Sequence, residues 1–247
     1  MDQQPLSSLR VGAEHVKVCP SVLGCDFGYL ADEVKRTEDA GADYLHLDIM
    51  DGHFVPNLTL GPQAVAAIRR ATTMFLDVHI MVYRPFDYIE RFVESGADMI
   101  TFHFEATEEV EETLNYIRKC NRKAGLSFCP ETSQSMIVNY LDKCDLVLLM
   151  TVHPGFGGQA FMPEVLEKIR FIRELCDRLN IRQGGVVASD DKPETLDLPP
   201  FDIQVDGGID DTTAKQCLDA GANLLVSGSH LYNAPDMAEA IRKLREA

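Results

Sequence analysis

The sequence has no tryptophan, few basic residues and no regular cysteine spacing. Its seven cysteines form no C-x-x-C pair and are odd in number, which argues against a disulfide framework and for reduced thiols. Lysine and arginine total 23 against 39 acidic residues, and the formal net charge of −16 makes a nucleic-acid partner unexpected. No apolar run could span a membrane, and residues 1–15 lack the apolar centre of a secretion signal. We therefore expect a cytoplasmic protein without a nucleic-acid or membrane partner.

Short apolar runs alternate with longer helical patterns along the 247 residues. Strands are predicted at residues 16–22, 43–49, 74–81, 97–104, 125–129, 145–152, 201–206 and 222–228. Helices are predicted near residues 28–40, 62–71, 85–95, 107–123, 133–142, 163–180, 211–220 and 235–246. Strict alternation implies parallel strands with right-handed crossovers, and a closed (β/α)8 TIM barrel suits a chain of this length. An open doubly wound sheet is disfavoured, because "CPSVLGCDFG" after the first strand is not a dinucleotide-binding glycine fingerprint.

The predicted architecture is therefore a single α/β domain over residues 16–247, with residues 1–15 as a loose tail. Three similar segments, "DAGAD", "ESGAD" and "DAGAN", each place a glycine at the end of a predicted helix, where a left-handed conformation stops it. The polar segment 182–200, "RQGGVVASDDKPETLDLPP", interrupts the alternation. Because it leads from a helix into a strand, we interpret it as a surface insertion on the barrel face away from the chemistry.

Polar side chains recur on one face of three predicted strands. Since side chains alternate along a strand, each set lies opposite the apolar residues of its strand and should point into the barrel. The set comprises His46, Asp48, Met50, Asp77, His79, Met81, Gln204 and Asp206. Each of these residues taken alone is more often a core or turn residue. Carboxylates that converge in a dry interior, however, are costly unless a cation or a proton neutralises their charge. Imidazole together with carboxylate favours Zn²⁺, Fe²⁺, Mn²⁺ or Co²⁺, so the pattern predicts a metal site.

Two further patterns occur near the carboxyl ends of the strands. Met50, Met81 and Met150 lie near three of these strand ends. A single methionine usually fills a gap in the core, whereas three together could form a wall with little water. The glycine-rich loops "HPGFGGQ" (153–159), "DGGI" (206–209) and "SGS" (227–229) follow the last three strands and precede helices. Such loops expose backbone amides, and the loops after strands seven and eight are the usual phosphate site of this barrel.

The segments "PSVL", "HLDIMDGHFVPN", "HIMV", "MTVHPGFGGQ", "VDGGI" and "SGS", in this order from about Val16 onward, resemble those of the ribulose-phosphate 3-epimerases. The resemblance implies interconversion of D-ribulose 5-phosphate and D-xylulose 5-phosphate by inversion at C3, a step of pentose phosphate metabolism. It also implies a homo-oligomer with one divalent metal ion per subunit. Zinc or Fe(II) is expected first, with Mn or Co as alternatives.

The resemblance assigns roles residue by residue. It makes His46, Asp48, His79 and Asp206 the metal ligands, with Asp48 and Asp206 as the catalytic proton-transfer pair. Met50, Met81 and Met150 match a methionine wall of the substrate pocket. Substrate and phosphate contacts are implied for Ser21, His79, Gly155, Phe156, Gly157, Gly158, Gly207, Gly208, Ile209, Gly228 and Ser229.

Some segments depart from the family pattern without touching an implied ligand. Gly24 and Cys25 replace Ser-Ala, "FCPE" (128–131) replaces the usual Asn-Pro segment, and His153 and "SGSHLYN" also differ. They leave open a 3-epimerase of another ketose phosphate, such as D-allulose 6-phosphate. A metal-free lyase or decarboxylase is disfavoured, because "HLDIMD" lacks the lysine of the related Asp-x-Lys-x-x-Asp motif. A barrel kept only for binding is disfavoured by the intact ligand set.

Overall fold

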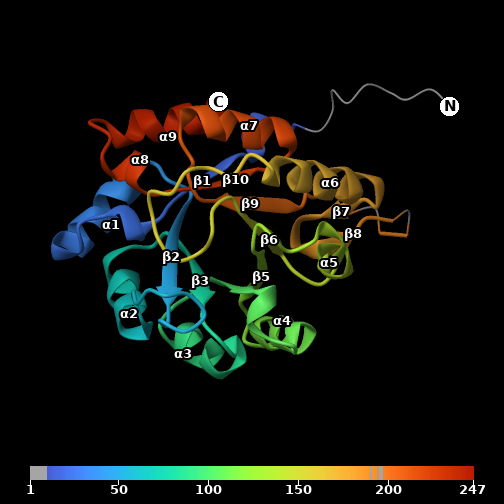
Figure 1. Ribbon diagram of the computed structural model, residues 1–247, viewed down its shortest axis with the longest axis horizontal. Coiled ribbons are helices and arrows are strands. Elements are labelled where there is room, and N and C mark those ends of the chain that lie inside the picture. The colour runs from blue at the N-terminus through green and yellow to red at the C-terminus, as the bar shows by residue number, and fades with distance from the viewer. Residues whose placement is uncertain (1–9, 190, 193, 195–196) are drawn as a thin grey trace.

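The fold is a closed barrel of parallel strands, seen in the computed structural model, which describes residues 10–189, 191–192, 194 and 197–247 (Figure 1). Its strands are β1 (Lys17–Pro20), β2 (Tyr44–Met50), β3 (Phe75–Met81), β4 (Met99–His103), β5 (Lys123–Phe128), β6 (Leu146–Met150), β9 (Asp202–Asp206) and β10 (Leu224–Ser227). Their order is β1-β10-β9-β6-β5-β4-β3-β2, with every neighbouring pair parallel. A parallel bridge between Ser21 and His46 joins β1 to β2 and closes the ring. The predicted (β/α)8 barrel is confirmed.

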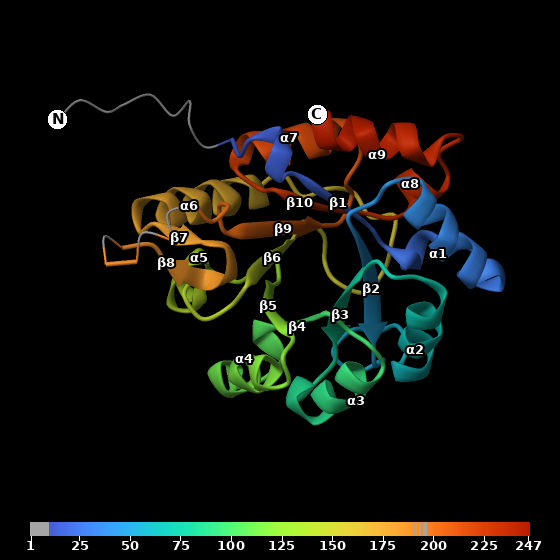
Figure 2. The ribbon, with the colours of Figure 1, turned by 180° about the vertical axis from the view of Figure 1, so that it is seen from behind.

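Helices surround the strands on the outside, as Figures 1 and 2 show from opposite sides. They are α1 (Leu30–Asp39), α2 (Pro62–Ala71), α3 (Ile89–Glu94), α4 (Val110–Lys119), α5 (Gln134–Ile137), α6 (Val165–Arg178), α7 (Asp211–Ala220), α8 (Ser229–Tyr232) and α9 (Met237–Glu246). Each longer helix buries one stripe: in α4 this stripe contains Val110, Leu114 and Ile117, at helical spacing. The helices α3 and α5 are shorter than predicted, because 3-10 turns at Pro85–Tyr88 and Val138–Tyr140 take up part of each segment.

The three predicted helix-ending glycines adopt left-handed conformations. The φ angles of Gly41, Gly96 and Gly221 are 79°, 96° and 107°. Other residues rarely adopt these angles, so glycine ends the helix and lets the chain turn into the next strand. The repeated sequence pattern therefore marks the same kind of helix-to-strand turn at three places.

The alternation along the strands separates two packing layers. Leu45, Leu47 and Ile49 of β2 face outward and join the large apolar cluster between sheet and helices. His46 and Asp48 face the barrel interior, where the apolar residues belong to a smaller cluster that includes Leu148 and Val226. The inward polar residues thus lie beside apolar residues of other strands: Val226 is in register with Asp206, and Leu148 with Gln204.

The segment after α6 is more ordered than a loop. Strands β7 (Ile181–Arg182) and β8 (Val186–Val187) form an antiparallel ribbon around a 3-10 turn, Gln183–Gly185. At Gly185, φ is 65° and a Cβ would lie 2.5 Å from the carbonyl oxygen of Cys144, which precedes β6. The start of the insertion therefore packs on the amino-terminal face of the barrel, away from the polar residues. Residues 190, 193 and 195–196 lie outside the described part of the chain.

Of the tail predicted for residues 1–15, residues 1–9 lie outside the described residues. Within the remainder, Val11 is buried and Ala13–His15 form a 3-10 turn that leads into β1. Among all the described residues, no helix combines the length and apolarity that crossing a membrane requires.

Candidate active site

Two histidines and two aspartates from three strands meet at the upper end of the barrel. His46 and Asp48 lie on β2, His79 on β3 and Asp206 on β9, and one ligand atom from each lies within 4.8 Å of the others. His46 Nε2 is 3.4 Å from Asp48 Oδ1 and 4.0 Å from Asp206 Oδ2. His79 Nδ1 is 3.2 Å from Asp48 Oδ1. The four side chains that the sequence proposed as ligands form one cluster.

The cluster contains an atom whose polarity no protein group satisfies. His46 is completely buried, and its Nε2 has no hydrogen-bond partner. Buried polar atoms are normally paired, so an unpaired imidazole nitrogen between two carboxylates indicates a missing cation or proton. Two imidazoles and two carboxylates fit a first-row divalent metal such as zinc or iron. These four residues could therefore hold the predicted metal.

Polar groups on the far side of His46 orient its ring. Asp77 Oδ2 lies 2.7 Å from His46 Nδ1 and accepts a hydrogen bond of 2.6 Å from the Gln204 side chain. The Thr101 hydroxyl donates to the other Asp77 oxygen over 3.4 Å. Burial alone would lower the pKa of His46, but the Asp77 and Asp48 carboxylates raise it, so that the ring is charged when no cation is bound. Because Asp77 keeps a proton on Nδ1, Nε2 is the nitrogen that would give up its proton and bind a cation between Asp48 and Asp206.

His79 is oriented in the same way through a second histidine. Its Nε2 lies 2.9 Å from His103 Nε2, and His103 Nδ1 lies 3.3 Å from Glu105 Oε2. One proton arrangement satisfies both contacts: His79 donates to His103, and His103 donates to Glu105. With a cation bound among the four ligands, this arrangement would present the lone pair of His79 Nδ1 to it; with no cation bound, a proton on Nδ1 can instead be donated to Asp48.

The two carboxyls of the cluster differ in their affinity for protons. Burial alone would raise the pKa of Asp48, but the charge of His46 and the hydrogen bond from His79 outweigh it and hold this pKa well below its ordinary range. Burial and the adjacent Asp48 carboxylate raise the pKa of Asp206 to about 7. In the metal-free protein near neutral pH, Asp48 is ionised and Asp206 exchanges a proton readily.

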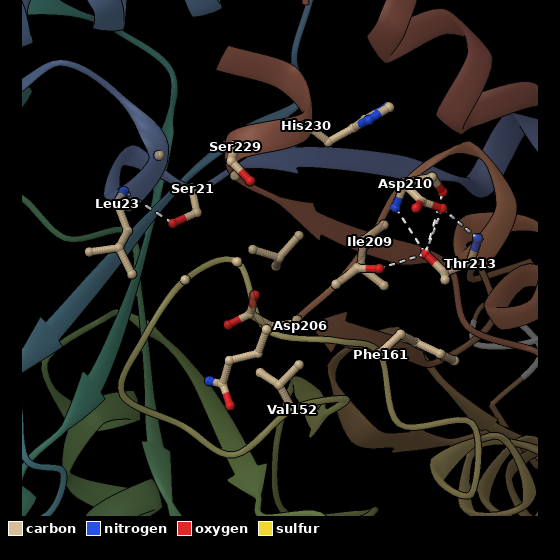
Figure 3. A pocket seen from close by; sticks show the side chains of 18 of the residues that line it. Ser21, Leu23, Val152, Phe161, Asp206, Ile209, Asp210, Thr213, Ser229 and His230 are labelled. Atoms are coloured by element: carbon tan, nitrogen blue, oxygen red, sulfur yellow. Dashed lines mark hydrogen bonds between the residues drawn. The ribbon is translucent and has the colours of Figure 1, made fainter. Parts of the chain in front are cut away.

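The cluster opens into a cavity of about 1380 Å³. Figure 3 shows Ser21, Asp206 and Ser229 around this space. The Ser21 hydroxyl donates to Asp48 Oδ2 over 2.6 Å. Apart from the buried His46 and His79, every predicted site residue lines the cavity; these residues are Ser21, Asp48, Met50, Met81, Met150, Gly155, Phe156, Gly157, Gly158, Asp206, Gly207, Gly208, Ile209, Gly228 and Ser229. The predicted methionines are each less than 5% exposed, so they present little surface to water.

Comparison with known proteins identifies the family. Residues 17–232 match the ribulose-phosphate 3 epimerase family. The chain belongs to this family. It is 48% identical over 225 residues to the ribulose-phosphate 3-epimerase of Chlamydia pneumoniae, covering 91% of each chain. Its identity to the enzyme of the same name from Bacillus subtilis is 43% over 230 residues, covering 93% of this chain and 98% of the relative.

Solved structures with a similar fold share little sequence with this epimerase. KGPDC from Streptococcus mutans superimposes with a TM-score of 0.66 at 13% identity, covering 94% of this chain and 96% of that chain. The tryptophan synthase α-subunit from Pyrococcus furiosus gives a TM-score of 0.64 at 13% identity, covering 97% and 100%. These likenesses concern the fold. The sequence relatives place the chain among the isomerases, as an epimerase acting on a carbohydrate phosphate.

The epimerase packs its glycine-rich loops closely against neighbouring backbone. At Gly208, φ is 65° and a Cβ would lie 2.8 Å from the Phe161 nitrogen. A Cβ on Gly24 would lie 2.7 Å from the Ser229 nitrogen. Gly24 is one of the departures from the family pattern, and in this structure its lack of a Cβ lets the first loop approach the loop after β10 closely.

Sequence reasoning missed several residues that position the ligands. His103 and Thr101 lie on the inward face of β4, and the same alternation that identified Asp48 would have found them. Glu105 follows the strand in the 3-10 turn Phe104–Ala106, where no periodic pattern marks it. Asp77 and Gln204 were recognised as inward residues, but their hydrogen bonds to one another could only be seen in three dimensions.

Proposed function

We propose that this epimerase interconverts D-ribulose 5-phosphate and D-xylulose 5-phosphate by inverting C3. The observation that carries the proposal is that two carboxyls from different strands, Asp48 and Asp206, face one cavity. They project from β2 and β9, which β1 and β10 separate in the ring. Inversion requires one group to remove a proton from one face of a carbon and another to return a proton to the opposite face.

In one direction, ionised Asp48 takes the proton from C3, and the electron pair of the broken C–H bond moves into a carbon–carbon double bond as negative charge develops on the former carbonyl oxygen. Asp206, which carries a proton, then delivers it to the other face of C3. The turnover leaves Asp48 protonated and Asp206 ionised. The reverse reaction begins from this state, with Asp206 as the base and Asp48 as the acid.

The quartet of His46, Asp48, His79 and Asp206 is the proposed site of one divalent ion, Zn²⁺ or Fe²⁺ first and Mn²⁺ or Co²⁺ as alternatives. When bound, such an ion supplies positive charge beside the substrate oxygens that become negative on deprotonation. Asp77 and His103 keep the two imidazole lone pairs directed at the quartet. The Ser21 hydroxyl holds Asp48 in position through its 2.6 Å hydrogen bond.

The phosphate is proposed to lie against the backbone of Gly155–Gly158, Gly207–Ile209 and Gly228–Ser229. Exposed amides at such loops attract an anion without a charged side chain. This matters in a chain with a formal net charge of −16, whose overall field repels a phosphorylated sugar. The Thr151 hydroxyl, which donates to the Gly207 carbonyl over 2.6 Å, holds one loop in place.

Turnover of both epimers of the pentulose phosphate, followed separately, tests the reaction. The Asp48→Asn and Asp206→Asn variants are each expected to lose at least roughly a thousandfold in kcat/KM, or about 4 kcal/mol of transition-state stabilisation. Circular dichroism checks that both retain the fold. Near-normal turnover in either variant would overturn the two-carboxylate proposal.

A hexulose phosphate such as D-allulose 6-phosphate is the remaining alternative substrate, and the cavity volume is large enough for either. The names of the relatives favour the pentulose. A comparison of kcat/KM on the two sugars decides. We expect a higher kcat/KM on the pentulose phosphate. A much higher kcat/KM on the hexulose phosphate would show that the proposed substrate is wrong, although the proposed reaction would stand.

A further inference from the structure

A second cluster of metal-binding side chains lies next to the catalytic quartet. It consists of His103 at the end of β4, Glu105 in the following turn and Cys129 directly after β5. One ligand atom from each lies within 4.8 Å of the other two. None of the three lines the large cavity, so the cluster is separate from the space proposed for the sugar.

The separations within this cluster match those of ligands around one zinc ion. Cys129 Sγ lies 3.6 Å from His103 Nδ1, which lies 3.3 Å from Glu105 Oε2. Zinc–nitrogen, zinc–oxygen and zinc–sulfur bonds of about 2.0–2.3 Å at tetrahedral angles place such ligand atoms roughly 3.3–3.6 Å apart. A cation bound between the three ligand atoms would replace the protons of His103 Nδ1 and of the Cys129 thiol.

The surrounding residues hold the ligands in place. Glu105 Oε1 accepts hydrogen bonds from the Cys129 backbone nitrogen, at 2.9 Å, and from the Thr132 hydroxyl, which leaves Oε2 free for a cation. Lys168 donates to the Cys129 and Pro130 carbonyls over 3.1 and 2.9 Å and fixes this turn. Burial and Glu105 raise the pKa of the Cys129 thiol well above its ordinary value, so metal binding there releases a proton.

We propose that His103, Glu105 and Cys129 form a second divalent-metal site, specific for ions that bind thiolate well, such as Zn²⁺ and Co²⁺. The fourth coordination position is left for water. Access is available from the surface, because the Glu105 side chain is 25% exposed and Cys129 is half-buried. Cys129 is part of the "FCPE" departure from the family pattern, which the epimerase reaction leaves unexplained.

Occupation of this site inhibits the epimerase. This consequence rests on the proposed function, in which His79 binds the catalytic ion through Nδ1 and donates its Nε2 proton to His103. A cation on His103 Nδ1 leaves neutral His103 with its proton on Nε2. Two N–H groups would then face each other across the 2.9 Å contact, which forces the rings apart and withdraws support from His79.

The test uses Co²⁺ as the probe, because a thiolate bound to cobalt gives a near-ultraviolet charge-transfer band and the catalytic quartet has no sulfur. Wild-type protein titrated with Co²⁺ is expected to develop the band and to bind one more equivalent than the Cys129→Ser variant, which lacks the band. Cys120→Ser is the matched control and should retain it. Asp206→Asn should retain the band as well, which separates failure of this site from failure of the catalytic quartet.

Absence of the band in the wild type, or its persistence in Cys129→Ser, would overturn the second site. Inhibition is measured with excess Zn²⁺ on the enzyme already loaded at its catalytic site. We expect the half-inhibitory Zn²⁺ concentration of Cys129→Ser to rise at least tenfold above that of the wild type and Cys120→Ser. Equal sensitivity in all three would overturn the inhibitory role.

Discussion

Asp77 Oδ2 lies 2.7 Å from Nδ1 of His46, and both side chains are completely buried. The carboxylate keeps a proton on Nδ1, so the other nitrogen, which lies beside Asp48 and Asp206 without a hydrogen-bond partner, is the one that can bind a cation. A residue that never touches the substrate thus determines which lone pair the site offers. The predictions below begin with this relationship.

Asp77→Asn is expected to weaken divalent-metal binding by roughly 10–100-fold, because an amide is a poorer acceptor and makes the imidazole less basic. Competition with a calibrated chelator measures the change. The exposed Asp39→Asn, in which the native carboxylate pairs with Lys35 on α1, serves as the control and should bind normally. Unchanged affinity in Asp77→Asn would contradict the role assigned to Asp77.

Removal of the metal is expected to lower stability against urea, because the ion binds only the folded state. Saturation at about 100 times Kd corresponds to about 2.7 kcal/mol. Unfolding curves with chelator and after addition of Co²⁺ measure the difference. Asp48→Asn, which lacks one of the four ligands, should bind the ion more weakly and gain less stability at the same Co²⁺ concentration. An equal gain in the variant would show that the stabilising ion binds elsewhere.

Asp206→Asn is expected to stabilise the metal-free protein at alkaline pH. The folded-state pKa of about 7 lies above the ordinary 3.8, so the folded state binds more protons than the unfolded state between these values. The stability of the wild type therefore falls as pH rises through this window. The side chain is 18% exposed, which moderates the cost, and we expect a gain of about 1–3 kcal/mol for the variant at pH 8.

Urea unfolding with chelator at pH 4 and pH 8 measures this effect. The gain should become small at pH 4, where the folded wild type carries the proton and the unfolded state, with its ordinary pKa of 3.8, carries it in part. A difference of the same size at both pH values would show that it does not arise from ionisation of Asp206.

Gly24→Ala is expected to raise KM for the sugar phosphate roughly tenfold, about 1.4 kcal/mol, with a smaller effect on kcat. The added methyl group would lie 2.7 Å from backbone atoms of Gly228 and Ser229 and would displace the proposed phosphate loop. Gly61→Ala is the matched control, because a Cβ there meets nothing within 4 Å. Steady-state kinetics measure KM for both variants. Equal KM values for Gly24→Ala and Gly61→Ala would contradict a role of the Gly228–Ser229 loop in phosphate binding.

Much of the fold and the centre of the site could be predicted because each depends on a local period. Alternation along β2 separates Leu47 from Asp48, and the glycines at 41, 96 and 221 mark the ends of helices. Each of these signals is contained within a few consecutive residues, so it can be recognised without the tertiary structure.

The remaining features depend on contacts between distant segments. Glu105 contacts His103, which in turn contacts His79. Nothing in the sequence around Glu105 indicates this series of contacts. The polar composition of the insertion concealed the β7–β8 ribbon, which Gly185 permits by its close approach to Cys144. Gly24 lines the cavity, and its close backbone contact with Gly228 and Ser229 of the last loop could be seen only in three dimensions.

The most direct test of the central claim, that Asp48 and Asp206 serve opposite faces of C3, is exchange of the C3 hydrogen in heavy water by each Asp→Asn variant loaded with Co²⁺. Each variant keeps one of the two carboxyls, so we predict that each incorporates deuterium into one epimer only, that the two variants select different epimers, and that neither interconverts them. Exchange of both epimers by a single variant, or selection of the same epimer by both, would contradict the account.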